Sequence, residues 1–344
     1  ETREQAFDGA EAVIVDYEPL APLMDVREAA QPDAHQLWTQ SPGNCCFAFQ
    51  VGDAAATEAA ISAAPTVVRL SSDNGRLVQN PLETRGYVGL WDAVEERYTL
   101  HAAAGKPQTV GRDLAHFVFG LPEDRVRAVV KDVGGGFGAK NPLYPEQALV
   151  LWTAKKLGRP VRWQASRSET FLADYQGRGQ AADAEMAFDA DGKVLAFRVR
   201  VLADLGAFLG PRGSTAPNMW RTMGASVYDF PAVDYEVRAI HTHNMPTCPY
   251  RGAGAPEAIF IIERLFDMAA AALGLAPGAI RRRNLVPAAA MPFKTAIGTT
   301  LDSGDFALIM DSAEEMADLG GFEARKADSE ARGRRRGLGY GNLL

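Results

Sequence analysis

The most informative local feature of the sequence is Arg125-Val-Arg-Ala-Val-Val-Lys-Asp-Val133, followed by Gly134-Gly-Gly-Phe-Gly-Ala-Lys-Asn141. The alternating residues predict a strand, and the glycines predict a loop whose backbone approaches a neighbour closely. The loop also fits G-x-G-x-x-A, but a dinucleotide-binding fold needs a helix that begins at the third small residue. Pro142 and Pro145 prevent that helix and disfavour that fold. The loop therefore either approaches an anion or planar group, or bends tightly and packs Phe137 in the core.

Outside this stretch, helices follow groups of strands, a pattern that favours the α+β class. Asp191-Gly192 predicts a hairpin turn, and Pro145 and Gly158 mark the two ends of a helix. The predicted strands are 12–17, 66–70, 85–91, 96–103, 125–133, 160–165, 180–188, 193–204 and 233–243. The predicted helices are 53–64, 113–119, 145–157, 256–273, 277–285 and 302–317, with 18–52 an extended connector and 320–336 a charged tail.

A second loop, His243 to Glu257, joins a strand to the longest predicted helix. It places Arg251 among small residues just before a helix N-terminus, an arrangement that suits an anion or a developing oxyanion. The alternative is that Arg251 simply pairs with Glu257 or another acidic neighbour. His241 and His243 share one strand face, but no third ligand stands at a useful spacing, so we expect no metal site there.

Composition narrows the function further. The chain has 344 residues and a net charge of −7, which disfavours a nucleic-acid surface. The most apolar run, 258–275, contains charged residues, so we expect no membrane span. The three cysteines lack C-x-x-C spacing, which predicts no iron–sulfur cluster on this chain and favours a reducing, cytoplasmic setting. Strand-like segments at 12–17 and 336–344 suggest that both ends are cut from a longer unit.

Further motifs follow one another along the chain. They are Val13–Leu20, Asn80–Gly86, Leu121–Val126, Val133–Lys140, Gly158–Val161 with Arg167 and Glu169, Tyr250–Gly254, Arg281–Leu285 and Asp302–Asp305. Taken in order, these motifs resemble the molybdenum-binding large subunit of the xanthine dehydrogenase, aldehyde oxidase and aerobic carbon monoxide dehydrogenase family, with Asn80 where His is usual. The resemblance covers about residues 10–342 and only the first half of the molybdenum domain.

The resemblance implies an α+β fold of mixed sheets with packed helices. Residues 1–30 would be a connector and the end of a small hammerhead-like domain. Residues 31–320 would be the first half of the molybdopterin-binding domain, as two lobes of about 31–175 and 176–320. Residues 321–344 would be a charged linker and the first strand of a missing second half.

The resemblance also implies roles for individual residues. Arg251 matches the arginine that faces the substrate and stabilises negative charge. Asn141 stands where purine-oxidising members carry a substrate-binding Glu, which argues against xanthine. Gly252 stands where the carbon monoxide branch carries the cysteine that holds copper, which argues against carbon monoxide. Lys106, or its neighbour Gly105, stands where the family has a Gln beside the metal. The implied cofactor-binding residues are Gly134, Gly135, Gly136, Phe137, Gly138, Lys106, Gly252, Ala253 and Gly254, with no metal ligand from this chain.

The implied function is oxidative hydroxylation of an aldehyde or N-heteroaromatic carbon, with water as the oxygen source. The implied cofactor is molybdenum held by molybdopterin, in the cytosine dinucleotide form. The family's carboxylate base lies in a G-x-G-E segment, which this sequence lacks. We therefore expect an isolated chain to be inactive, and to need a second-half molybdenum-domain chain, a small 2Fe–2S subunit and an FAD subunit. Lys106 and Asn80 favour an alternative, a non-catalytic or relic scaffold without molybdenum.

Overall fold

The computed structural model describes residues 2–344. Its strands are β1 (Cys45–Gly52), β2 (Thr66–Asn74), β3 (Gly86–Asp92), β4 (Arg97–Ala102), β5 (Val126–Val129), β6 (Val161–Gln164), β7 (Gln180–Phe188), β8 (Val194–Gly206), β9 (Val233–His241), β10 (Phe293–Lys294) and β11 (Thr300–Leu301). Its α-helices are α1 (Arg3–Glu11), α2 (Val26–Ala29), α3 (Ala54–Ala63), α4 (Pro107–Asp113), α5 (Pro145–Leu157), α6 (Arg167–Ala173), α7 (Thr215–Asn218), α8 (Trp220–Met223), α9 (Ala255–Leu273), α10 (Pro277–Asn284), α11 (Phe306–Met316) and α12 (Phe322–Ala331).

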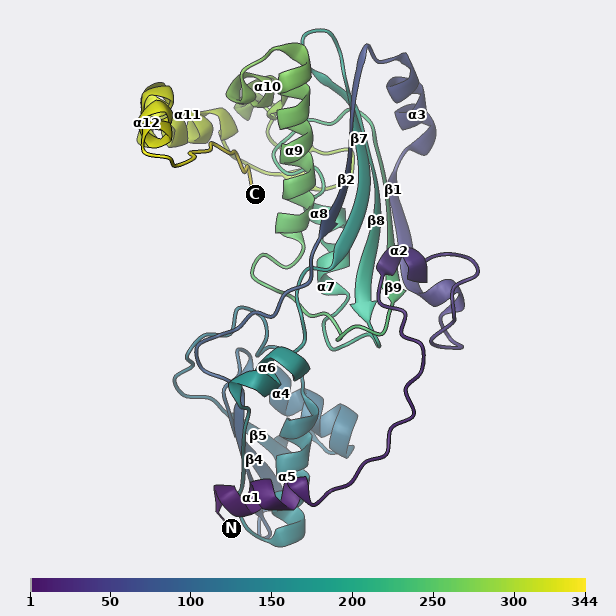
Figure 1. The fold of residues 1–344 in the computed structure, drawn as a ribbon, viewed down its shortest axis with the longest axis vertical. Coiled ribbons are helices and arrows are strands. Elements are labelled where there is room, and N and C mark those ends of the chain that lie inside the picture. Colours follow the sequence, from purple (N-terminus) through teal and green to yellow (C-terminus); the bar gives the residue numbers. More distant parts are fainter. Residues whose placement is uncertain (1) are drawn as a thin grey trace.

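Two lobes are visible, each built on one main sheet (Figure 1). The larger sheet has the order β1-β9-β8-β7-β2, and the smaller sheet has the order β5-β4-β3-β6. Both contain antiparallel pairs and one parallel pair, β8–β9 in the larger and β4–β5 in the smaller. These mixed sheets with packed helices confirm the predicted α+β class.

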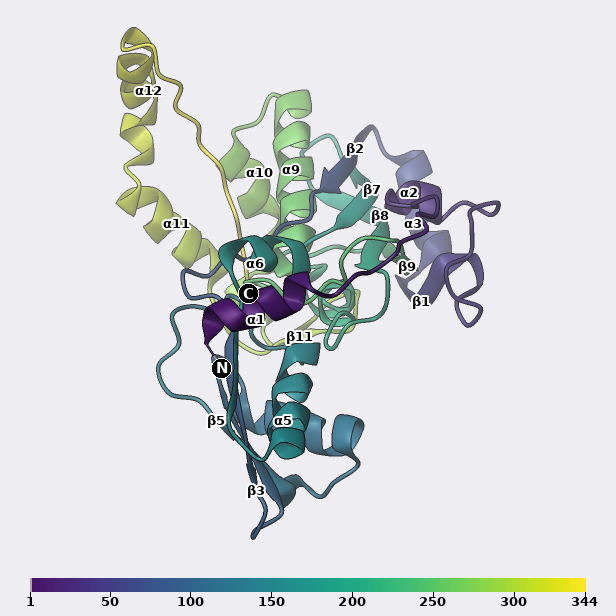
Figure 2. The same cartoon turned by 60° about the horizontal axis from the view of Figure 1, so that its bottom comes forward.

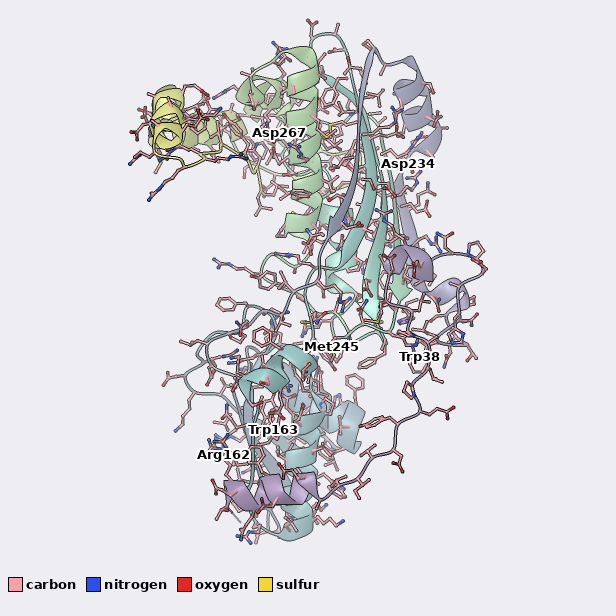
Figure 3. All side chains as sticks on the ribbon, viewed as in Figure 1. Trp38, Arg162, Trp163, Asp234, Met245 and Asp267 are labelled. Carbon is pink, nitrogen blue, oxygen red and sulfur yellow. The ribbon has the colours of Figure 1, made fainter. Side chains whose placement is uncertain are left out.

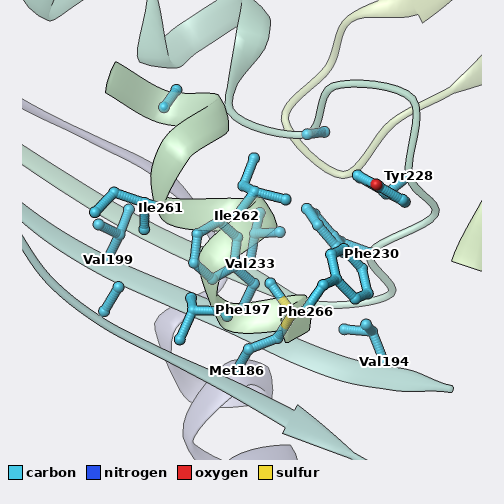
Figure 4. Packing of buried hydrophobic residues seen from close by; sticks show 14 of the residues in the cluster. Met186, Val194, Phe197, Val199, Tyr228, Phe230, Val233, Ile261, Ile262 and Phe266 are labelled. Carbon is cyan, nitrogen blue, oxygen red and sulfur yellow. The ribbon is translucent and has the colours of Figure 1, made fainter. Parts of the chain in front are cut away.

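The core of the larger lobe forms where α9 crosses the sheet (Figure 4). Phe266 of α9 packs edge-on against Phe188 of β7, with 6.0 Å between ring centroids. Phe197 and Val233 bury fully on the same face of the sheet. Burying a large apolar side chain stabilises the fold by roughly 1.5–3 kcal/mol, so this cluster fixes α9 on the sheet. Ile61 of α3 covers the opposite face.

The smaller lobe is held by α5, whose ends match the prediction. Pro145 stands in its first turn, and Gly158 closes it in the left-handed conformation at φ +63°. On the sheet, Tyr87 stacks on Trp163 with 5.4 Å between ring centroids; Figure 3 labels Trp163 in this lobe. The predicted helix at 113–119 is instead the end of α4 followed by a π-helical turn, Leu114–Phe119.

The N-terminal expectations are partly wrong. The predicted strand 12–17 has no regular structure and runs exposed between α1 and α2, because no strand among residues 2–344 pairs with it (Figure 1). The predicted connector 18–52 contains β1, which pairs antiparallel with β9. Its register joins residues almost two hundred positions apart, which a local pattern does not reveal.

The lobes do not follow the predicted division near residue 175. Residues 45–74 carry β1, α3 and β2, and both strands belong to the sheet of β7, β8 and β9. The smaller lobe is therefore inserted between β2 and β7. Strand order depends on pairings between distant segments, so sequence order alone did not predict it.

The C-terminal segment also differs from the expectation. The charged tail contains α12, which with α11 stands apart from both sheets (Figures 1 and 2). Residues 336–344 form no strand. They contact α11, where Tyr340 donates to Glu314 at 2.8 Å, and then the larger lobe, where the backbone N–H of Asn342 donates to Glu263 of α9 at 3.0 Å. Among the described residues, no helix combines the length and apolar character needed to cross a membrane.

Candidate active site

The glycine loop leaves β5 in a conformation that requires glycine. Gly135 has φ +92° and Gly138 has φ +114°, both outside the range that L side chains readily adopt. Phe137 also has a positive φ, +50°, and remains 47 % exposed. The alternative in which Phe137 packs in the core is therefore wrong. The ring is held at the surface by a strained backbone, a feature that clusters at functional sites.

The second loop packs directly on the first, at the junction of the lobes near Met245 (Figure 3). The backbone N–H of Arg251 donates to the carbonyl of Phe137 at 3.0 Å. A Cβ on Gly138 would stand 1.8 Å from the carbonyl oxygen of Pro249, which only glycine permits. The two stretches that the sequence singled out thus form one surface.

The Arg251 side chain is exposed and makes no ion pair or side-chain hydrogen bond within residues 2–344. Glu257 pairs with Arg178 instead, at 3.0 Å, and both side chains are largely buried. Arg178 also donates to the Arg251 carbonyl at 3.0 Å and lies over the Tyr250 ring, 4.6 Å from its centroid. The alternative of an Arg251–Glu257 pair is therefore wrong, and the Arg251 guanidinium is left for a ligand.

A third loop brings Lys106 and Asn141 to the same region. The N–H of Gly105 donates to the carbonyl of Lys140 at 3.2 Å. A Cβ on Gly105 would stand 2.2 Å from the Asn141 side-chain oxygen. Lys106 is exposed at the start of α4. The positions predicted from three separate segments therefore lie on neighbouring loops.

The donor set suits an acceptor-rich cofactor. Within the described part of the chain, the backbone N–H groups of Gly135, Gly136, Phe137 and Gly138 have no acceptor. The N–H groups of Gly252 and Gly254 have none in residues 2–344 either. Free donors on glycine-rich backbone can approach phosphate or pterin oxygens and nitrogens without steric conflict. Ala253, between those two glycines, has φ +47°.

The comparison with protein families shows which family the chain belongs to. Residues 37–285 match the molybdopterin cofactor-binding domain, and this range includes all three loops. The chain belongs to this family. The match confirms the resemblance drawn from the motifs and supports a molybdenum cofactor on this molybdopterin cofactor-binding domain.

Individual relatives agree with this result. The carbon monoxide dehydrogenase large chain of Hydrogenophaga pseudoflava is 32% identical, over 95% of this chain and 42% of that protein. The nicotine 6-hydroxylase large subunit of Paenarthrobacter nicotinovorans is 31% identical, over 98% of this chain and 41% of that protein. The structure of quinoline 2-oxidoreductase from Pseudomonas putida 86 superposes with a TM-score of 0.89 and 33% identity, over 96% and 42% of the two chains. The chain thus spans less than half the length of these relatives.

The molybdopterin cofactor-binding domain contains functional candidates that the sequence reasoning missed. Glu83, Lys140 and Arg178 all bind the loops directly. Glu83 and Lys140 lie inside quoted motifs, but nothing in those motifs indicates that the two side chains meet. Arg178 follows Gly177 and has a positive φ of +63°, which a sequence does not reveal for an arginine.

A buried ion-pair network adjoins the glycine loop through Tyr144, whose hydroxyl donates to the Ala139 carbonyl at 2.9 Å. Arg85 donates to Asp174 at 2.6 Å and to Glu146 at 2.9 Å, and its guanidinium lies 3.8 Å from the centroid of the Tyr144 ring. Burial raises the pKa of Asp174, and the Arg85 cation opposes that shift. Such a pair is costly to break, because removing one partner leaves an uncompensated buried charge.

Two further groups near the junction are structural. Burial raises the pKa of the Cys248 thiol to about 12, and Gln79 donates to its sulfur at 3.2 Å. His243 accepts a hydrogen bond from the N–H of Leu23 at 2.8 Å, and His241 lies buried with Nδ1 3.3 Å from the Gly206 carbonyl. Residues 2–344 contain no group of three or more His, Cys, Asp or Glu placed to hold a metal.

Proposed function

We propose that this chain forms part of a molybdenum hydroxylase that oxidatively hydroxylates an aldehyde or N-heteroaromatic carbon, with water as the oxygen source. The observation that carries the proposal is the contact between the two loops. The backbone N–H of Arg251 donates to the Phe137 carbonyl, so the residue that carries an unpaired guanidinium adjoins a run of free backbone donors. Names of relatives such as nicotine 6-hydroxylase and quinoline 2-oxidoreductase support the heteroaromatic class.

The residues of this chain would have separate roles in binding the cofactor and the substrate. Gly134 to Gly138, with Lys106 and Gly252 to Gly254, would bind and orient the molybdopterin. The free backbone N–H groups of Gly135 to Gly138, Gly252 and Gly254 would be the donors. When bound, the cofactor supplies the two-electron oxidation and the metal that activates water. Arg251 would face the substrate and stabilise negative charge that develops on it. Asn141, where a purine-oxidising member has Glu, favours a substrate other than xanthine, and Gly252 argues against carbon monoxide.

We further propose that the activity needs partner chains: a second-half molybdenum-domain chain, a small 2Fe–2S subunit and an FAD subunit. Relatives named as a large subunit and as a subunit of a dehydrogenase complex support an assembly of several chains, and the match covers 42% of the length of the Hydrogenophaga relative. The three cysteines lack cluster spacing, which supports iron–sulfur centres elsewhere. Residues 31–320 would form the cofactor-binding unit. The cofactor would be the cytosine dinucleotide form of molybdopterin, and the protein would work in the cytoplasm.

The test is to co-express the chain with the proteins encoded beside it and to measure molybdenum and pterin in the purified complex. About one molybdenum per complex supports the proposal. A complex that assembles without metal contradicts it and supports the alternative, a scaffold without molybdenum. Two features of the resemblance favour that alternative: Lys106, or its neighbour Gly105, stands where the family has Gln, and Asn80 stands where His is usual.

A further inference from the structure

The Glu83 carboxylate contacts both ends of the glycine loop, at Gly134 and at Lys140. The Glu83 side chain, in the connection between β2 and β3, accepts the N–H of Gly134 at 2.8 Å and the ammonium of Lys140 at 2.6 Å through the same oxygen. The backbone N–H of Glu83 donates back to the Gly134 carbonyl at 3.1 Å. Gly134 and Lys140 bound the residues that carry the free backbone donors, so a single side chain sets the distance between the two ends of the loop.

The Glu83–Lys140 ion pair differs from a surface ion pair because the lysine side chain is buried. The Lys140 side chain is 1% exposed, whereas that of Glu83 is 39% exposed. An ammonium so deeply buried needs a charged partner, and Glu83 is the partner present in residues 2–344. Burial raises the pKa of Glu83, but the hydrogen bonds from Lys140 and Gly134 hold it below its ordinary value. The carboxylate is therefore ionised at neutral pH.

The steric fit points the same way. A Cβ on Gly134 would stand 2.6 Å from the Cβ of Glu83, so the loop begins in contact with this residue. A Cβ on Gly136 would stand 3.7 Å from the Cβ of Lys140, so the lysine stem lies under the middle of the loop. The Lys140 carbonyl also accepts the N–H of Gly105, which ties the third loop to the same lysine.

We propose that Glu83, through its ion pair with Lys140, is a positioning residue that holds the donors of Gly135 to Gly138 at the spacing required for molybdopterin. The inference rests on the proposed function and deepens it, because it names what sets the cofactor loop. Charge-assisted hydrogen bonds are shorter and stronger than neutral ones, so the charge on Glu83 matters as well as its length.

The test compares Glu83→Gln and Lys140→Met with a matched control, Asp92→Asn. Asp92 is also a carboxylate of the smaller lobe that accepts two backbone N–H groups, at 2.9 and 3.0 Å, but in the β3–β4 turn. The full complex is prepared with cofactor and, from a host that makes no molybdopterin, without it. Amide hydrogen exchange, the rate of molybdopterin release and the thermal midpoint are measured for each variant.

In the cofactor-free complex, we expect the amides of Gly134 and Ala139 to exchange roughly tenfold faster in Glu83→Gln than in wild type. Lys140→Met keeps the apolar side chain near Gly136 but removes the ammonium that binds Glu83. The amide of Ala139 should therefore exchange faster, whereas the amide of Gly134 should exchange at the wild-type rate, because Gly134 keeps its hydrogen bond to Glu83. In the loaded complex, both variants should release molybdopterin faster, roughly tenfold, and Asp92→Asn should not. The double variant should be no worse than the more severe single variant, because both remove one interaction.

Two results would overturn the inference. Unchanged exchange in Glu83→Gln would mean that the carboxylate does not order the loop. If amide exchange is faster in Glu83→Gln but molybdopterin is released at the wild-type rate, the Glu83–Lys140 ion pair has only a structural role. A wild-type complex that contains no molybdopterin contradicts the proposed function itself. If the wild-type complex contains molybdopterin and the Glu83→Gln complex releases it at the same rate, only the positioning role of Glu83 is contradicted.

Discussion

Replacing Gly138 with alanine should force the two loops of the site apart. Its added Cβ would stand 1.8 Å from the carbonyl oxygen of Pro249, and its φ of +114° is unfavourable for any L side chain. Gly158 provides a matched control in the same lobe. It closes α5 at φ +63°, and a Cβ there would meet no atom within 4 Å. Both alanine variants have positive-φ strain, which is larger at Gly138 because its φ lies beyond the left-handed helical region, and only Gly138→Ala has the clash.

The expected magnitudes follow from these contacts. Left-handed backbone costs an L residue about 1–2 kcal/mol, which is the full expected effect of Gly158→Ala. Gly138→Ala adds overpacking of about 1–3 kcal/mol and loss of the Arg251–Phe137 hydrogen bond, about 1 kcal/mol. Gly138→Ala should therefore lower the free energy of unfolding by about 2–4 kcal/mol more than the control.

Urea unfolding of both variants measures this difference, and molybdenum content measures its consequence for the site. Gly138→Ala should lose most of the metal, whereas Gly158→Ala should retain it. If the two variants unfold within about 0.5 kcal/mol of each other and hold equal molybdenum, the close approach of the loops is refuted.

Three further predictions test the surroundings of the site. Arg251→Ala should lower kcat about 10²-fold with little loss of molybdenum, and loss of the pterin instead would show that the residue binds cofactor rather than substrate. Arg85→Met should lower the free energy of unfolding in urea by about 3–5 kcal/mol, because Asp174 and Glu146 lose their cation, and an effect under 1 kcal/mol would contradict this. Cys248, with its pKa raised to about 12, should be thiolate in only roughly one molecule in 10⁴ at pH 8, so iodoacetamide should label it only after unfolding or as the pH rises toward 12. Labelling of native protein at the rate of the unfolded chain, read by mass spectrometry, would refute the buried thiol.

The elements predicted correctly carry their signals locally. Pro145 and Gly158 bound α5, and Asp53 caps α3 by accepting the N–H of Ala56 at 3.0 Å. The hairpin of β7 and β8 turns at Asp191-Gly192, where Gly192 has φ +83°. Each of these features depends on a few adjacent residues, so composition and spacing suffice to predict it.

The errors concern segments whose structure depends on a distant partner. Residues 45–52 form a strand because β9 offers an edge, and residues 12–17, with more β-branched side chains, remain irregular because none of the described strands pairs with them. Strand propensity reflects packing and pairing more than the backbone itself. The same dependence placed β2 in the larger lobe and made the predicted division of the lobes inaccurate.

The site was partly predictable, because a glycine that must allow a close approach is visible in the sequence even though the approaching atom is not. Gly138 indicated the need for space, but only the fold showed that the Pro249 carbonyl takes it. The role of Arg251 was undecidable for a similar reason. Glu257 was its nearest acidic neighbour in sequence, and it was Arg178, more than seventy positions earlier, that neutralised Glu257 and left Arg251 unpaired. Whether a charged side chain is free to bind a ligand therefore depends on whether its acidic neighbours are already paired with other residues. That pairing is a property of the whole fold.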